Sequence, residues 1–119
     1  GTITYGPYTA SACTVETAHT EIRCTTVAGV GAGRQFTVAV GGQSSGAFAG
    51  QTLSYGPPSI SDVTAPAAMA TAGGEQVVLI GSNFGPSGTG VTVTYGTAGD
   101  SYAAFTAASC VLAVAHSRI

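Results

Sequence analysis

The 119-residue sequence has no lysine and no tryptophan, and only 7% of its residues are charged. Three arginines and five acidic residues give a formal net charge of −2. Bases this sparse do not form the positive patch that attracts a nucleic-acid backbone or an anionic membrane surface. We therefore expect no nucleic-acid partner.

Long apolar runs and helix signals are scarce as well. No apolar stretch approaches the roughly 20 residues that cross a bilayer, so we expect no membrane insertion of this segment. The one helix-compatible stretch, residues 65–72, contains Pro66 and is followed by two glycines, which favours a loop.

Short β-branched runs separated by Gly, Pro and Ser make up the rest of the chain and predict strands. The runs lie at residues 2–5, 13–17, 20–25, 35–40, 52–55, 59–63, 76–80, 91–95 and 111–115. Phe36, Val38 and Val40 alternate with smaller residues, which predicts that all three point to the core. Glycine-rich residues 28–33 and 41–46 predict loops. The pattern indicates an all-β sandwich.

Catalytic and metal-binding patterns are missing. The sequence has no Gly-x-Ser-x-Gly elbow and no Cys/His zinc spacing, and its acids are scattered. We therefore predict no enzyme activity, no catalytic residue, and no metal or cofactor site. His19 and His116 occupy matching places in two similar segments, so we interpret both as structural or surface residues.

Self-similarity is the strongest signal in the chain. Residues 3–6 match residues 93–96 at an offset of 90, whereas Cys13, His19 and Ile22 match Cys110, His116 and Ile119 at an offset of 97. The difference places a seven-residue insertion near residues 97–103. A long fixed period is typical of a modular array.

The Gly56-Pro57-Pro58 sequence predicts the boundary between two modules, because two prolines make a stiff, extended joint. We assign residues 1–56 to the C-terminal part of one module and residues 57–119 to the N-terminal part of the next.

The three cysteines fit one pair in each module. Cys13 and Cys24 lie in one copy, and Cys110 stands where Cys13 does in the other, so we predict a Cys13–Cys24 disulfide. The partner of Cys110 would then lie just past Ile119. A disulfide favours an oxidising compartment, and three buried free thiols in a reducing cell are the alternative.

Several motifs resemble those of the IPT/TIG family, immunoglobulin-like modules of extracellular receptors and surface proteins. The matching segments are Pro58-Ser59-Ile60, Gly73-Gly74, Gly81-Ser82-Asn83-Phe84-Gly85, Val93-Thr94-Tyr95-Gly96, Cys13, Ile22-Arg23-Cys24-Thr25, residues 38–45 and Leu53-Ser54-Tyr55. The order is rotated, with the family's later motifs first, and Thr26 stands where the family often has proline. The resemblance implies an immunoglobulin-like β-sandwich built from tandem or head-to-tail half-modules.

The Gly81–Gly85 motif also has a direct physical interpretation. It predicts a turn in which Gly81 and Gly85 take positive φ, Asn83 tolerates such a conformation, and Phe84 closes the end of the sandwich.

These observations predict a structural, non-catalytic module at the cell surface or outside the cell. Each half lacks strands of a complete module, so we expect head-to-tail contacts with adjacent modules or other copies, which would build a fibre, stalk or surface array. Folding of both halves into one rotated sandwich is the alternative arrangement. Glycans would be O-linked, because the only asparagine, Asn83, is not in a sequon. The alternative function is a carbohydrate- or receptor-binding module, with Tyr8 and Tyr102 as candidate surface contacts.

Overall fold

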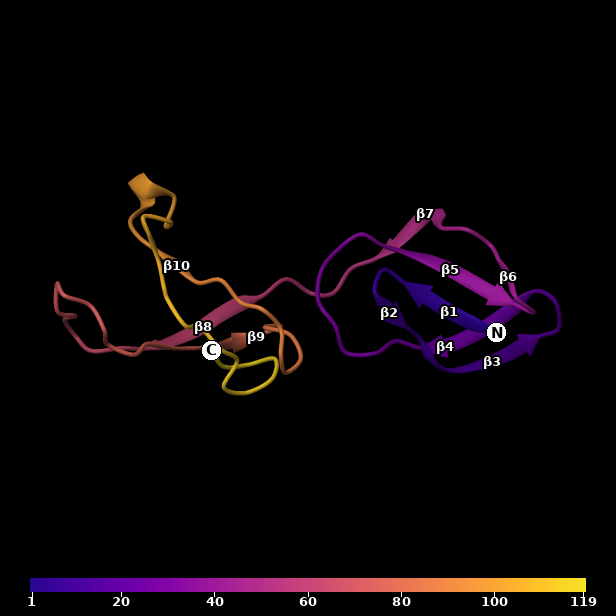
Figure 1. The fold of residues 1–119 in the computed structure, drawn as a ribbon, viewed down its shortest axis with the longest axis horizontal. Coiled ribbons are helices and arrows are strands. Elements are labelled where there is room, and N and C mark those ends of the chain that lie inside the picture. The colour runs from indigo at the N-terminus through magenta and orange to yellow at the C-terminus, as the bar shows by residue number, and fades with distance from the viewer. The chain divides into compact units, whose positions relative to one another are not determined.

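The computed structural model describes all 119 residues, which divide into two compact units, Gly1–Gly56 and Pro57–Ile119. The division falls at the Gly-Pro-Pro sequence (Figure 1). The protein is all-β: one five-stranded and three two-stranded antiparallel sheets, with a three-residue 3₁₀ turn, Ala98–Asp100, as its single helical element.

The first unit is built on the five-stranded sheet. Its strands are β1 (Thr2–Tyr5), β2 (Tyr8–Thr9), β5 (Arg34–Val40), β6 (Gln43–Ser44) and β7 (Phe48–Leu53). Strand β5 is central, with β1 on one edge and β6 and β7 on the other. Tyr5 lies opposite Phe36 and Ile3 opposite Val38, so these four side chains share one face of the sheet.

Val40 departs from the predicted core face, because its side chain is 56% exposed. It lies beyond the last paired residue of β1 and leads directly into a turn. Gly41 and Gly42 form that turn with φ of 57° and 82°, which suits a two-residue hairpin between β5 and β6. The segment predicted as a loop is therefore a tight hairpin.

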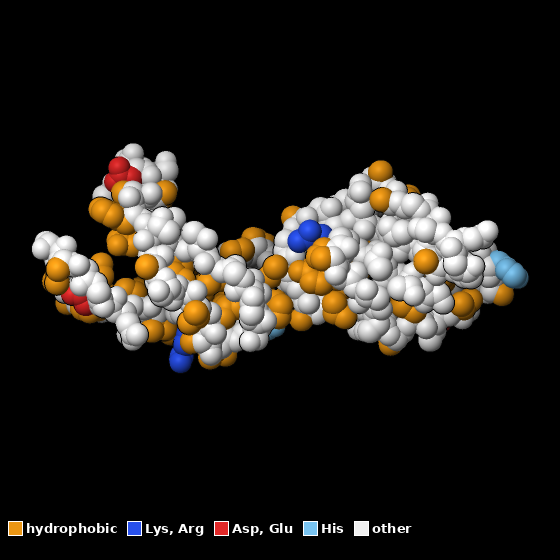
Figure 2. All heavy atoms as spheres, in the orientation of Figure 1, with side chains coloured by type: hydrophobic (Ala, Val, Ile, Leu, Met, Phe, Trp, Pro, Cys, Tyr) orange, Lys and Arg blue, Asp and Glu red, His pale blue; other side chains and the backbone are white.

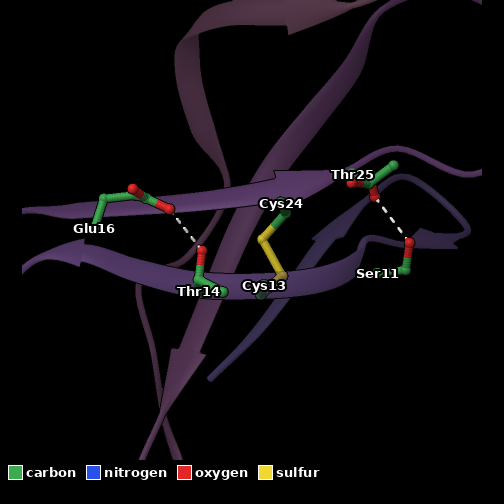
Figure 3. Close-up of a disulfide and its surroundings, with 6 residues drawn as sticks. All are labelled: Ser11, Cys13, Thr14, Glu16, Cys24 and Thr25. Atoms are coloured by element: carbon green, nitrogen blue, oxygen red, sulfur yellow. Dashed lines mark hydrogen bonds between the residues drawn. A yellow bond between two sulfur atoms is a disulfide. The ribbon is translucent and has the colours of Figure 1, made fainter.

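Strands β3 (Ser11–Thr17) and β4 (Glu21–Thr25) form a separate hairpin in the first unit. Cys13 and Cys24 form the predicted disulfide across it, with Cα atoms 4.1 Å apart (Figure 3). Ser11 Oγ, at one end of the hairpin, donates to the Thr25 carbonyl over 3.3 Å. The bridge and this hydrogen bond hold β4 against β3.

The second unit contains four short strands and the 3₁₀ turn. Strand β8 (Ser59–Thr64) pairs with β9 (Val78–Ser82), and β10 (Thr94–Tyr95) pairs with β11 (Phe105–Thr106). The other edge of β9 pairs with the chain end: Leu79 and Ile119 exchange two backbone hydrogen bonds of 3.0 and 3.1 Å, and Gly81 N donates to Ser117 O over 2.9 Å. The buried apolar residues of this unit are Leu79 and Phe84.

Three predicted strands were wrong in part or in full. Residues 111–115 form no strand, and only an isolated bridge joins Val114 to Arg118. Residues 91–95 are extended strand only at β10. Strand β7 ends at Leu53, because Tyr55 N turns to donate to Gly31 O over 2.9 Å. Residues 52–53 and 94–95 are strand because each pairs with a neighbouring strand, β5 and β11 respectively, and the rest of these predicted runs has no such ladder.

The Gly81–Gly85 motif is a turn, with one correction. Asn83 and Gly85 have φ of 60° and 99°, and Phe84 is 5% exposed, as predicted. Gly81 does not take positive φ. Glycine is needed at this position because there is no room for a side chain: a Cβ atom would collide with the Ser59 carbonyl oxygen of the neighbouring strand β8.

Candidate functional site

The first unit has a tyrosine cluster that fastens the loop between β4 and β5. The Val27 N–H donates to Tyr5 Oη over 2.8 Å, and Tyr55 Oη donates to Val27 O over 2.6 Å. A hydroxyl has one proton, so the 3.2 Å contact between the two tyrosine oxygens is a bond that Tyr5 donates to Tyr55. Tyr5 is the one fully buried large side chain. Partial burial, followed by the bond with Tyr5, raises the pKa of Tyr55 to about 12.

Tyr8 belongs to the same cluster and is half-buried. Its hydroxyl accepts a 2.8 Å hydrogen bond from Val30 N and donates a 3.0 Å bond to Val30 O. The Arg34 guanidinium lies 5.7 Å from its ring centroid. The Tyr8 hydroxyl therefore bonds to the loop backbone both as donor and as acceptor. Tyr102, in the second unit, is 64% exposed. The two candidate residues thus belong to different units.

Glycine makes this close packing possible. A Cβ atom on Gly29 would lie 2.6 Å from Tyr8 Cζ and 2.8 Å from Tyr55 Cζ. The loop backbone thus passes directly against the two rings, and we interpret the cluster as an anchor for the loop.

An apolar groove lies between the five-stranded sheet and strand β4. Its volume is about 460 Å³, and it is lined mainly by apolar side chains of both layers, including Ile3, Phe36, Val38, Ile22 and Phe48. Phe48 is 60% and Ile22 37% exposed. Sequence reasoning missed this groove, although the apolar residues at alternate positions on β1 and β5 were a signal for it.

Strand β4 also has an unpaired edge beside the groove. It pairs with β3 alone, so its other edge carries backbone N–H and C=O groups without a strand partner. Ile22, Cys24 and Thr26, at alternate positions, line the groove. The site therefore offers both a hydrogen-bonding edge and an apolar surface, which together suit an added β-strand.

The remaining polar groups do not gather. No three His, Cys, Asp or Glu side chains lie close enough together to hold a metal ion. His19 and His116 are both exposed turn residues with φ of 69° and 67°. Cys110 is a free, half-buried thiol. No helix in the structure has the length and apolar character to cross a membrane. Figure 2 shows few charged side chains on the face in view, with apolar side chains spread over both units.

Comparisons with protein-family models, with curated proteins and with solved structures give no significant match. The IPT/TIG resemblance rests on the sequence motifs alone.

Proposed function

We propose that this chain is a structural, non-catalytic repeat module that assembles head to tail into an extracellular fibre, stalk or cell-surface array. In this proposal the two units are parts of successive IPT/TIG-like modules with an immunoglobulin-like sandwich fold. Each unit supplies some strands of the sandwich, and the neighbouring module or copy supplies the others.

The observation that carries the proposal is the large exposed surface. The chain exposes 8227 Å² for a mass of 11.6 kDa. Two separate compact proteins of half this mass would together expose about 7,000 Å². The excess does not depend on how the units are arranged, because the comparison already treats them as separate. Thirteen large apolar side chains are exposed, whereas the only buried ones are Tyr5, Leu79 and Phe84.

Corresponding geometry in the two units supports the repeat. Thr4 and Tyr5 pair with Thr9 and Tyr8, and Thr94 and Tyr95 pair with Thr106 and Phe105 in the same way. The Ala10 N–H donates to Ile3 O and the Ala107 N–H to Val93 O, both over 2.9 Å. The longer loop in the second unit contains the 3₁₀ turn, at the place where the sequence comparison predicts an insertion.

The disulfide supports an oxidising compartment, and therefore an extracellular location, because such bonds are rare in reducing cytosol. Polar, weakly charged surfaces rich in Ser and Thr also fit O-linked glycans. Both features belong to secreted surface proteins more often than to cytosolic enzymes.

Sedimentation velocity of the 119-residue chain over a range of concentrations, with electron microscopy of the same samples, tests the proposal. We expect polymers that grow with concentration, because exposed apolar surface and open strand edges favour association. Phe48→Ser, in the groove, should weaken assembly, while Val111→Ser, at a 69% exposed position outside the groove, should not. A compact monomer at every concentration would refute the array.

The alternative, a carbohydrate- or receptor-binding module, is favoured by one observation, the 64% exposed ring of Tyr102. A glycan-array screen with wild-type protein and a Tyr102→Ala variant distinguishes it. Binding that disappears in the variant would support this function, and no binding to any glycan would count against the carbohydrate form of it.

A further inference from the structure

The second unit shows which strand fits beside a segment like β4. Its strand β9 runs antiparallel to residues 117–119, with Leu79 and Ile119 bonded to each other through both N–H groups. Ile80 lies opposite Arg118 in an isolated bridge. Because Leu79 and Ile119 exchange two bonds, Ile80 and Arg118 form the adjacent non-hydrogen-bonded pair.

Residues 116–119 correspond to residues 19–22, which lead into β4. The sequences read His-Ser-Arg-Ile and His-Thr-Glu-Ile. Both segments follow the same turn: Thr20 N donates to Thr17 O over 3.1 Å, and Ser117 N donates to Val114 O over 3.2 Å.

The pairing after the turn corresponds as well. Thr17 pairs with Glu21 in the first unit, and Val114 pairs with Arg118 in the second. The sequence match and the backbone pairing thus agree: Ile22 corresponds to Ile119, and Glu21 corresponds to Arg118.

The two segments differ in what lies on their outer edge. Ile119 faces β9, whereas the edge of β4 that carries Ile22 has no strand partner. In the second unit, β9 pairs with the edge that is open in the first unit. That pairing gives the direction and the register expected for a strand added to β4.

We propose that the open edge of β4 accepts strand β9 of a second copy of this chain, antiparallel, with Leu79 opposite Ile22 and Ile80 opposite Glu21. This inference rests on the proposed head-to-tail assembly and names the strand that makes the contact. In this register Val77 lies opposite Cys24. Directly opposed residues point to the same side of a sheet, so Val77 and Leu79 enter the apolar groove that Ile22 and Cys24 line.

The exchange replaces one pairing with a longer one. Strand β9 of the donor copy leaves residues 117–119. In this register the five-residue strand β4, which the disulfide already fixes against β3, lies opposite residues 76–80, so the longer pairing extends β9 by Gln76 and Val77. Val77, now 41% exposed, becomes covered in the groove. Removing residues 117–119 should therefore free β9 and increase the pairing between copies.

Cysteine cross-linking between two differently tagged full-length chains tests the register. One chain carries Glu21→Cys or Arg23→Cys, and the other carries Ile80→Cys or Val78→Cys. Both chains also carry Cys110→Ser, and their native disulfide is intact. Copper phenanthroline is the oxidant, and peptide mass spectrometry identifies the linked residues. The tags report only links between separate chains.

The register predicts links for the combinations 21 with 80 and 23 with 78. The mismatched combinations, 21 with 78 and 23 with 80, are displaced by two residues, or about 7 Å along the strand, and should give about tenfold less linked dimer. Two matched pairs keep the test valid if one cysteine variant does not fold, which circular dichroism checks.

Failure of this inference is distinguishable from failure of the array. Polymers that form with equal or no linkage in the matched combinations would overturn the strand pairing and leave the array standing. Monomers at all concentrations would overturn both. A further variant carries both cysteines of a matched combination in one chain. If this variant forms the link only within a single chain, the strand beside β4 does not come from a second copy.

Discussion

The hydroxyl of Tyr5 offers a precise test of how the first unit is held together. Tyr5→Phe keeps the buried ring but removes the oxygen that accepts the 2.8 Å bond from Val27 N and that bonds to Tyr55 Oη. The half-buried Val27 N–H is then left without an acceptor. We expect the local stability of the loop between β4 and β5 to fall by about 2 kcal/mol, the usual cost of an orphaned buried donor.

Hydrogen exchange followed by mass spectrometry is the suitable assay, because it localises the change to one unit. A loss of about 2 kcal/mol corresponds to roughly 30-fold faster exchange of the Val27 amide when exchange follows local opening. Global unfolding is less informative here, since two units need not unfold in one transition.

The second unit provides the matched control. Tyr95 corresponds to Tyr5 in the repeat, but it is 47% exposed and only its ring packs, against Phe105 at 5.3 Å between centroids. Tyr95→Phe should therefore leave exchange unchanged. Equal effects of the two substitutions, or an unchanged Val27 amide in Tyr5→Phe, would refute the role assigned to the cluster.

Three other perturbations address the disulfide, the raised pKa and the loop packing. Replacing Cys13 and Cys24 together with serine should lower stability by about 3 kcal/mol, because the bridge closes a loop of roughly a dozen residues, and urea unfolding should show a lower midpoint. Stability should fall between pH 10 and 12, because the unfolded chain loses the Tyr55 proton near its usual pKa while the folded chain keeps it up to about pH 12. Tyr55→Phe should make that loss less steep in pH-dependent thermal unfolding. Gly29→Ala should lower the melting temperature because its methyl group would overlap two tyrosine rings, whereas Gly90→Ala, with no atom within 4 Å of its added carbon, should not.

Four strands of the first unit were predictable because their residues alternate, whereas β2 and β6 were not predicted and β7 begins four residues before the predicted run. The prediction for residues 2–5 gives β1 without change, and the predictions near β3, β4 and β5 differ by at most two residues at their starts. The disulfide was predictable because two cysteines in one copy leave a single pairing.

The candidate site was predictable only in outline. From the motifs we expected incomplete modules with open strand edges, but the sequence did not say which edge is open. That edge depends on β4 pairing with β3 alone, a long-range outcome that residue patterns do not encode. Likewise, residues 111–115 form no strand, because their pairing is limited to the single bridge between Val114 and Arg118.

By itself the sequence determined the all-β character, the position of the boundary between the units, the disulfide and the matching of residues between the two units. These follow from local properties: side-chain alternation, proline geometry, cysteine count and self-similarity. Only the tertiary structure decided that Tyr8 serves the loop instead of the surface, and that β9 pairs with residues 117–119. Both depend on which distant segments come into contact, because a hydroxyl or a strand edge bonds to whatever the fold places beside it.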